Sequence, residues 1–220
     1  MASVASLREH LVEELNDLVN AEQQLIEALP QMAKRATDRS LRAAFTAHLG
    51  ETKQHEKRAT QALKQLGETA SGKTCEAMKG LLEEGQELMD GADAGALRDA
   101  MLITAAQKVE HYEIATYGTV RTYASLLGEK SVARLLEQTL KQEKAADKKL
   151  TSIAERTVNR RAATEFKEQT RIVDSATGMM EKGAAWVGST VGGAMKRVMR
   201  GQAADKPRRK SGGRSRKSAR

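Results

Sequence analysis

The chain has 220 residues, two prolines, one cysteine, 3% aromatic residues and a net charge of +8. This length allows one domain of ordinary size with an appendage. A single cysteine excludes an intramolecular disulfide, and no apolar stretch approaches the roughly 20 residues that span a bilayer. The N-terminus lacks a charged-then-apolar leader, so we expect a cytoplasmic protein that is not secreted by a signal peptide.

The positive charge is concentrated at one end of the chain. Residues 195–220 contain eleven Lys or Arg and one Asp, a net charge of +10, which leaves −2 for residues 1–194. This division into a nearly neutral body and a strongly basic tail indicates that the two parts of the chain have separate roles.

Strong helix formers dominate the composition, and the first two predicted elements are helices. Leucines recur at helical spacing from residue 7 to residue 29 and predict the first helix. Pro30 lies within this pattern and is expected to kink or interrupt it. The second predicted helix begins near Ser40, which we expect to be its N-cap, and ends before Gly67.

The second half of the body repeats this arrangement after a long connection. Residues 67–95 are punctuated by glycines around a short amphipathic helix at 75–89. Two further long helices are predicted at 96–127 and 131–158. Two helical hairpins joined by one long crossover are the topology of ferritin-like four-helix bundles. We therefore predict an all-α bundle domain at 1–158 and a C-terminal extension at 159–220.

Acidic residues interrupt the apolar stripe of each long helix. Residues three or four apart share a helical face, so neighbouring polar positions can point to one place in the core. An isolated buried carboxylate is costly unless it is neutralised, paired or bound to a metal. Two interpretations stay open: solvated faces with interhelical salt bridges, or a site for two metal ions. The candidate ligands are Glu22, Glu51, His55, Glu110, Glu113, Glu143 and Asp147.

Four segments carry a resemblance to a known family. They are LVNAEQQLIEALPQMA at 18–33, HLGETKQHEKR at 48–58, AAQKVEHYEIATYGT at 105–119 and TLKQEKAADKKL at 139–150. In this order they resemble the YciE/YciF-like family of bacterial stress-associated proteins, which belongs to the ferritin-like superfamily. The resemblance covers residues 5 to about 157 and implies a di-iron type centre in a homodimer.

The resemblance also implies roles for the glutamates. Glu22 and Glu113 would be the lone carboxylates of the two hairpins, Glu51 and Glu143 would be candidates to bridge the metals, and Glu110 resembles the extra carboxylate of rubrerythrin-like sites. The superfamily motif is Glu-x-x-His, whereas His55 and Asp147 follow their glutamates by four residues. These two residues either bind metal directly or orient its ligands.

Other residues carry weaker signals. His48 shares a face with Glu51 and is a weaker ligand candidate than the glutamates. His111 either orients a ligand or makes an ordinary interhelical hydrogen bond. Tyr117 lies one turn from Glu113 and either donates a hydrogen bond to the site or fills core space. Cys75 is interpreted as structural or incidental.

Two hypotheses for function follow. The first is a di-metal protein of the bacterial stress response, with Fe most favoured and Mn or Zn as alternatives, which oxidises metal while reducing peroxide or dioxygen. The second is a structural or interaction module. In both, residues 196–220 could contact nucleic acid non-specifically or an anionic membrane, or could be a solvated extension without function.

Overall fold

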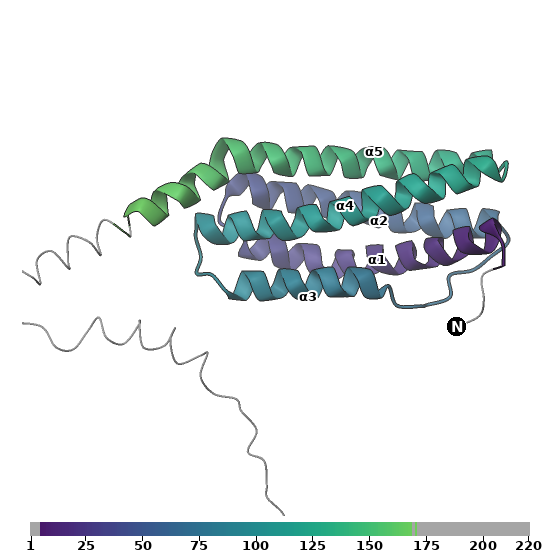
Figure 1. Cartoon of the computed structure of the whole chain (residues 1–220), viewed down its shortest axis with the longest axis horizontal. Coiled ribbons are helices and arrows are strands. Elements are labelled where there is room, and N and C mark those ends of the chain that lie inside the picture. The colour runs from purple at the N-terminus through teal and green to yellow at the C-terminus, as the bar shows by residue number, and fades with distance from the viewer. Residues whose placement is uncertain (1–4, 169, 171–220) are drawn as a thin grey trace, which may run out of the picture. The chain divides into compact units, whose positions relative to one another are not determined.

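The computed structural model describes residues 5–168 and 170, and these residues form helices and no strands (Figure 1). The elements are α1 (Leu7–Arg35), α2 (Arg39–Gln65), α3 (Glu76–Asp90), α4 (Ala96–Leu126) and α5 (Lys130–Ile153). The prediction of an all-α domain is thus confirmed for this part of the chain. None of the described helices is long and apolar enough to cross a bilayer.

The helices begin and end at residues that satisfy their free backbone groups. The Ser6 side chain accepts a hydrogen bond from Glu9 N at the start of α1. Asp38 caps α2 by accepting from Ser40 N and Leu41 N, so the prediction of Ser40 as the cap is wrong by two residues. An aspartate is an equally good cap, and the carboxylate carries a charge that favours the positive end of the helix dipole.

Pro30 does not interrupt α1, which continues to Arg35. The ring removes one N–H donor and leaves the carbonyl of Ile26 without its usual helical partner. Because Pro30 is exposed, water can hydrate this side of the helix. The sequence-based expectation of an interruption is therefore not met.

The long helices pair as two hairpins that pack against each other. α1 packs on α2, and α4 packs on α5, while α2·α5 and α1·α4 contacts join the pairs. The crossover between the hairpins contains α3, which packs on α4 and α1 (Figure 1). Gly128, with φ of 80°, makes the tight turn between α4 and α5 that a residue with a Cβ would strain.

A buried aspartate ties the first hairpin to the second. Asp99 on α4 is fully buried and accepts hydrogen bonds from Thr37 N at 2.7 Å and Asp38 N at 2.8 Å, as well as from the Thr37 hydroxyl. Thr37 and Asp38 lie in the three-residue connection between α1 and α2. One carboxylate on α4 thus fixes the point at which α2 begins.

The core consists of two hydrophobic clusters with a polar layer between them. One cluster includes Leu25, Phe45, Leu102 and Leu150, and the other includes Leu18, Ala59, Tyr117 and Leu140. On each long helix the two clusters occupy different stretches. The intervening stretches carry the buried polar residues Glu22, His48, Thr52, His55, Glu110, Glu113 and Glu143.

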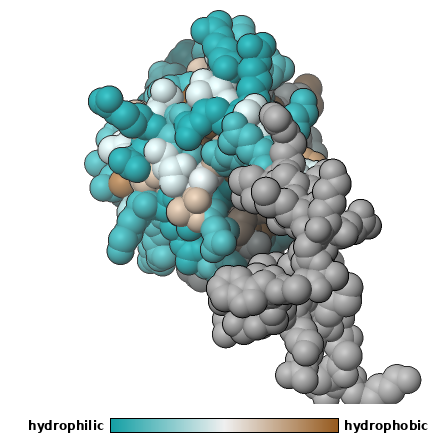
Figure 2. Space-filling model, turned by 90° about the vertical axis from the view of Figure 1, so that its left-hand side faces the viewer, coloured by the Kyte–Doolittle hydropathy of each residue, from teal (hydrophilic) through white to brown (hydrophobic). Residues whose placement is uncertain are grey.

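The chain stays helical beyond the predicted boundary at residue 158. A π-helical turn, η1 (Ala154–Val158), follows α5, and an α-helical stretch continues through 159–168. Glu165 in this stretch accepts a hydrogen bond from Ala96 N, the first residue of α4. Figure 2 views the end of the bundle where the α1–α2 and α3–α4 connections lie, and its described residues are mostly hydrophilic. The boundary between the two predicted domains stays a prediction, and the basic segment 196–220 lies outside the described residues.

Candidate metal centre

Six potential metal ligands from all four long helices meet in the polar layer. Glu22 is on α1, and His48 and His55 are on α2. Glu110 and Glu113 are on α4, and Glu143 is on α5. None of the six exposes more than 6% of its surface. They occupy one depth because each lies near the middle of its helix, between the two hydrophobic clusters.

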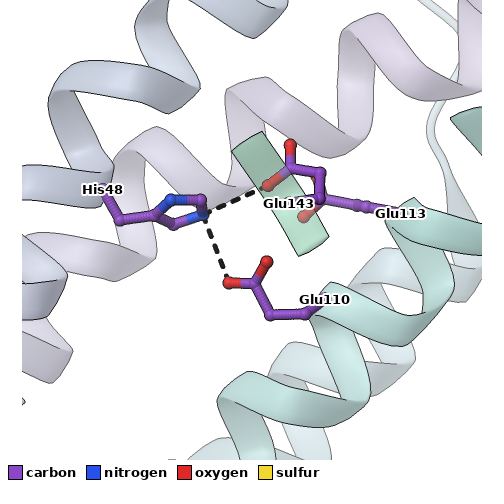
Figure 3. A group of neighbouring side chains, drawn as sticks. All are labelled: His48, Glu110, Glu113 and Glu143. Atoms are coloured by element: carbon purple, nitrogen blue, oxygen red, sulfur yellow. Dashed lines mark ion pairs between the residues drawn. The ribbon is translucent and has the colours of Figure 1, made fainter. Parts of the chain in front are cut away.

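The ligand atoms form two groups that share one residue. His48, Glu110, Glu113 and Glu143 form the first group, which Figure 3 shows converging on a common point. Glu22, His55 and Glu143 form the second. Within each group the ligand atoms lie within 4.8 Å of one another. Glu143 belongs to both groups: its Oε2 lies 3.7 Å from His48 Nε2, and its Oε1 lies 2.7 Å from His55 Nδ1.

Most of the polar atoms in these groups lack a hydrogen-bond partner. Eleven buried side-chain N and O atoms among the described residues have none, and eight of them belong to the six ligand candidates. His55 Nδ1 lies 2.7 Å from Glu143 Oε1, yet neither atom makes a hydrogen bond. Buried polar atoms without partners are costly, and such atoms directed at one shared point are typical of metal ligands. The donor set of carboxylates and imidazoles fits Fe or Mn, and Zn as well.

Burial changes the protonation of the cluster. It raises the pKa of Glu110 to about 9 and that of Glu113 to about 8. The pKa values of Glu22 and Glu143 are also raised, by burial and by the neighbouring carboxylates. Burial lowers the pKa of His55 to about 3. The cluster without metal therefore holds protons on its carboxyl groups at neutral pH, and a binding metal ion must displace them.

The second nitrogen of each histidine ring is fixed by a neighbour. His48 Nδ1 lies 3.3 Å from Glu51 Oε2, and the hydrogen bond from His48 lowers the pKa of Glu51, which keeps it an acceptor. His55 Nε2 lies 3.2 Å from Gln142 Oε1, whose oxygen also accepts from Arg58 at 2.7 Å. An oxygen acceptor requires the proton on the nitrogen that faces it. His48 Nε2 and His55 Nδ1 thus keep free lone pairs directed at the carboxylates.

Tyr117 combines the two roles considered for it. Its side chain is fully buried in the core, and its hydroxyl donates a 2.6 Å hydrogen bond to Glu22 Oε1. This bond fixes one oxygen of Glu22 and leaves Oε2 free of hydrogen bonds.

Two of the predicted ligands lie outside both groups. The Glu51 side chain is 44% exposed and contacts the cluster through His48. Asp147 Oδ1 accepts from Gln107 Nε2 at 3.0 Å and lies 3.4 Å from His111 Nε2. His111 therefore makes an interhelical contact between α4 and α5. Glu51 and Asp147 are placed to position other side chains around the centre.

His48 and Gln142 are the residues that sequence reasoning undervalued or missed. His48 contributes a ligand atom to the first group, although we ranked it below the glutamates. A signal was present, because His48 and His55 are seven residues apart and so share one face of α2. Nothing in the sequence marks Gln142 as the acceptor for His55.

A polar pocket leads from the surface to this centre between α2 and α5. Its volume is about 120 Å³, and the polar residues in its lining are His48, Glu51, Glu110 and Lys149. Phe45, Leu150 and alanines form the rest of the lining. The ionised Glu51 at this pocket attracts cations, and the four polar side chains of the lining can hydrogen-bond hydrated solutes.

The fold and the site define a helical bundle with a buried carboxylate and histidine cluster able to hold metal ions. The chain belongs to the family described as "Domain of unknown function (DUF892)", which matches residues 6–163. It is 44% identical over 149 residues to Protein YciF of Escherichia coli, covering 67% of this chain and 90% of that protein. The resemblance to the YciE/YciF-like stress proteins is thus confirmed.

Solved structures agree with this family. The E. coli stress protein YciF has a TM-score of 0.68 at 41% identity, over 71% of this chain and 99% of that one. YcfI of Rhodopseudomonas palustris, provisionally described as a structural protein, has a TM-score of 0.67 at 39% identity, over 70% and 98% of the chains. A Xanthomonas campestris protein with 24% identity and a TM-score of 0.58, covering 74% of this chain and 99% of that one, shares the fold.

Proposed function

We propose that this chain is a ferritin-like four-helix protein of the bacterial stress response that holds two metal ions, iron foremost, in its buried cluster. One ion would be held by His48, Glu110, Glu113 and Glu143, and the other by Glu22, His55 and Glu143. The observation that carries the proposal is the set of eight buried ligand atoms without hydrogen-bond partners. Among the described residues, no Lys or Arg forms an ion pair with the buried glutamates of the cluster, so cations from solution are the natural counter-charge.

The proposed chemistry is a metal-centred oxidation. When bound, two ferrous ions supply one electron each, so that one hydrogen peroxide and two protons become two waters. The protein excludes water from the centre, orients the ligands and provides an exit for protons. Its hydrophobic clusters exclude bulk water on both sides of the centre, and Tyr117 and Glu51 orient Glu22 and His48. The carboxyl protons released on metal binding leave through the polar pocket.

The test is an anaerobic Fe(II) titration of the metal-free protein. We expect two ions per chain, followed by Fe(II) oxidation when peroxide is added. Glu143→Gln should reduce the stoichiometry because both groups lose an oxygen ligand. Glu137→Gln, on a half-exposed position of the same helix, is the matched control and should bind as the parent does. Equal binding by both variants would contradict the assignment.

A structural role is the second candidate, and the description of YcfI favours it. In this case metal ions stabilise the bundle, chelation lowers the melting temperature, and the loaded protein consumes no peroxide. The family resemblance also leads us to propose a homodimer in the cytoplasm, which light scattering of the purified protein can test. Contact of residues 196–220 with nucleic acid or an anionic membrane is likewise a proposal, tested by binding with and without this segment.

A further inference from the structure

A second cavity, distinct in chemistry from the polar pocket, approaches the centre from the side of α3. It has a volume of about 150 Å³ and lies between α1, α3 and α4. Its lining is mostly apolar and includes Leu25, Leu82, Met89 and Val109. Glu110 lines both this cavity and the polar pocket, so the cavity ends at a candidate ligand of the first metal group.

Water is poorly accommodated in this cavity. A buried water needs two to four polar partners. The cavity offers few: Gln31 is on the exposed side, and the Gln86 amide donates to Asp90 at 2.8 Å. Glu110 Oε2 is buried without a hydrogen-bond partner. An enclosed apolar cavity of about 150 Å³ stays dry and takes up xenon or benzene, and the mostly apolar lining here favours the same class of ligand.

Small residues line the cavity, and a larger side chain in place of Ala28 would fill it. Ala28 on α1 and Gly85 on α3 are among the lining residues. At Gly85, an added Cβ would lie 3.2 Å from the Cβ of Ala105 on α4. Glycine at this position therefore lets α3 approach α4 closely.

We propose that this cavity is a binding site for one small apolar molecule, and that dioxygen is the member of this class that it delivers to the metal centre. The dioxygen assignment rests on the proposed function, whereas the cavity site does not. Dioxygen is apolar and partitions into dry apolar space, while peroxide and metal ions need hydrogen-bonding surroundings. The two openings thus separate the reactants. Polar solutes enter through the polar pocket beside Glu51, and dioxygen reaches Glu110 through the cavity beside α3.

The binding site is tested with xenon on the metal-free, full-length protein. Methyl-labelled protein should show xenon-dependent chemical-shift changes at Ala28 and Leu82 and none at Ala133, which packs against the other hydrophobic cluster. Ala28→Leu, which fills the cavity, should abolish these changes, and Ala133→Leu, a matched change at another half-buried helical alanine, should not. Absence of xenon-dependent shifts in the parent protein would overturn the site, even if the variant failed to fold.

The dioxygen assignment is tested with the iron-loaded protein. Ala28→Leu should slow Fe(II) oxidation by dioxygen severalfold and leave oxidation by peroxide unchanged, and Ala133→Leu should slow neither. Equal rates with dioxygen in the parent and Ala28→Leu, or equal slowing with both oxidants, would overturn the delivery role. If the parent consumes neither oxidant, the proposed function and the dioxygen assignment both fail, and the xenon result alone decides whether the cavity binds apolar molecules.

Discussion

Raising the pH of the metal-free protein is expected to weaken its fold through the buried carboxyl groups. Glutamate in an unfolded chain has a pKa near 4.5, whereas Glu113 and Glu110 in the fold have pKa values of about 8 and about 9. At pH values between 4.5 and about 8, these two carboxyl groups are protonated in the native state and deprotonated in the unfolded state. The stability that these groups contribute is thus present below about pH 4.5 and is lost as the pH rises through 8 and 9.

The magnitude follows from proton linkage. Each carboxyl group that stays protonated in the native state lowers the free energy of unfolding by about 1.4 kcal/mol per pH unit. His55 opposes this trend below about pH 6.5, because its pKa is lowered to about 3 in the fold. Above pH 6.5 the opposition ends. From there to pH 8, Glu110 and Glu113 together should remove roughly 4 kcal/mol, or about 8–16 °C in melting temperature for a domain of this size.

The assay is thermal and urea unfolding followed by circular dichroism, with chelator present, in steps from about pH 6.5 to pH 8. A Glu110→Gln/Glu113→Gln double variant cannot titrate at these two positions, so its profile should lose their share of the slope. The slope that remains comes from Glu22 and Glu143, whose pKa values are also raised. Added metal should flatten the parent profile too, because metal binds the deprotonated form. A metal-free parent whose stability is constant or rises over this range would refute the reasoning.

Three substitutions test the contacts around the centre. Tyr117→Phe removes the donor to Glu22 and should weaken metal binding about tenfold while the bundle stays folded, as measured by titration and circular dichroism. Gln142→Leu removes the acceptor for His55 and should lower metal affinity roughly 10- to 100-fold, and unchanged affinity would count against fixation of the ring. Asp99→Ala leaves the Thr37 N–H, the Thr37 hydroxyl and the Asp38 N–H without an acceptor. It should lower the free energy of unfolding by about 3 kcal/mol in urea titrations, without changing metal stoichiometry.

The fold was largely predictable because the apolar periodicity is local and repeated. Leucine spacing gives α1, and the glycine-bounded crossover with its short helix separates the two hairpins as expected. The errors occur at positions that tertiary contacts determine. Asp38 replaces Ser40 as the cap of α2 because Asp99, 61 residues later, binds Asp38 N. No local pattern could reveal this contact.

The site was predictable to the level of the helix face and not beyond it. Glu22, Glu110, Glu113 and Glu143 could be recognised from the sequence, because each occupies a position where the helical repeat calls for an apolar residue. The sequence could not show which of two neighbouring polar residues on a face turns inward. His48 lies in the cluster and Glu51 behind it, because the rotation of α2 against α4 and α5 is set by packing along the whole helix.

The contact of Asp99 with the α1–α2 connection has a consequence for hydrogen exchange. Amide protons in a short surface connection usually exchange by local fraying, within the least stable part of a fold. Thr37 N–H and Asp38 N–H instead donate to a fully buried carboxylate on the other hairpin. They can exchange only when these bonds to Asp99 break, so their protection factors should be well above those of an ordinary surface turn. This turn therefore reports the docking of the hairpins, residue by residue, in a single exchange experiment.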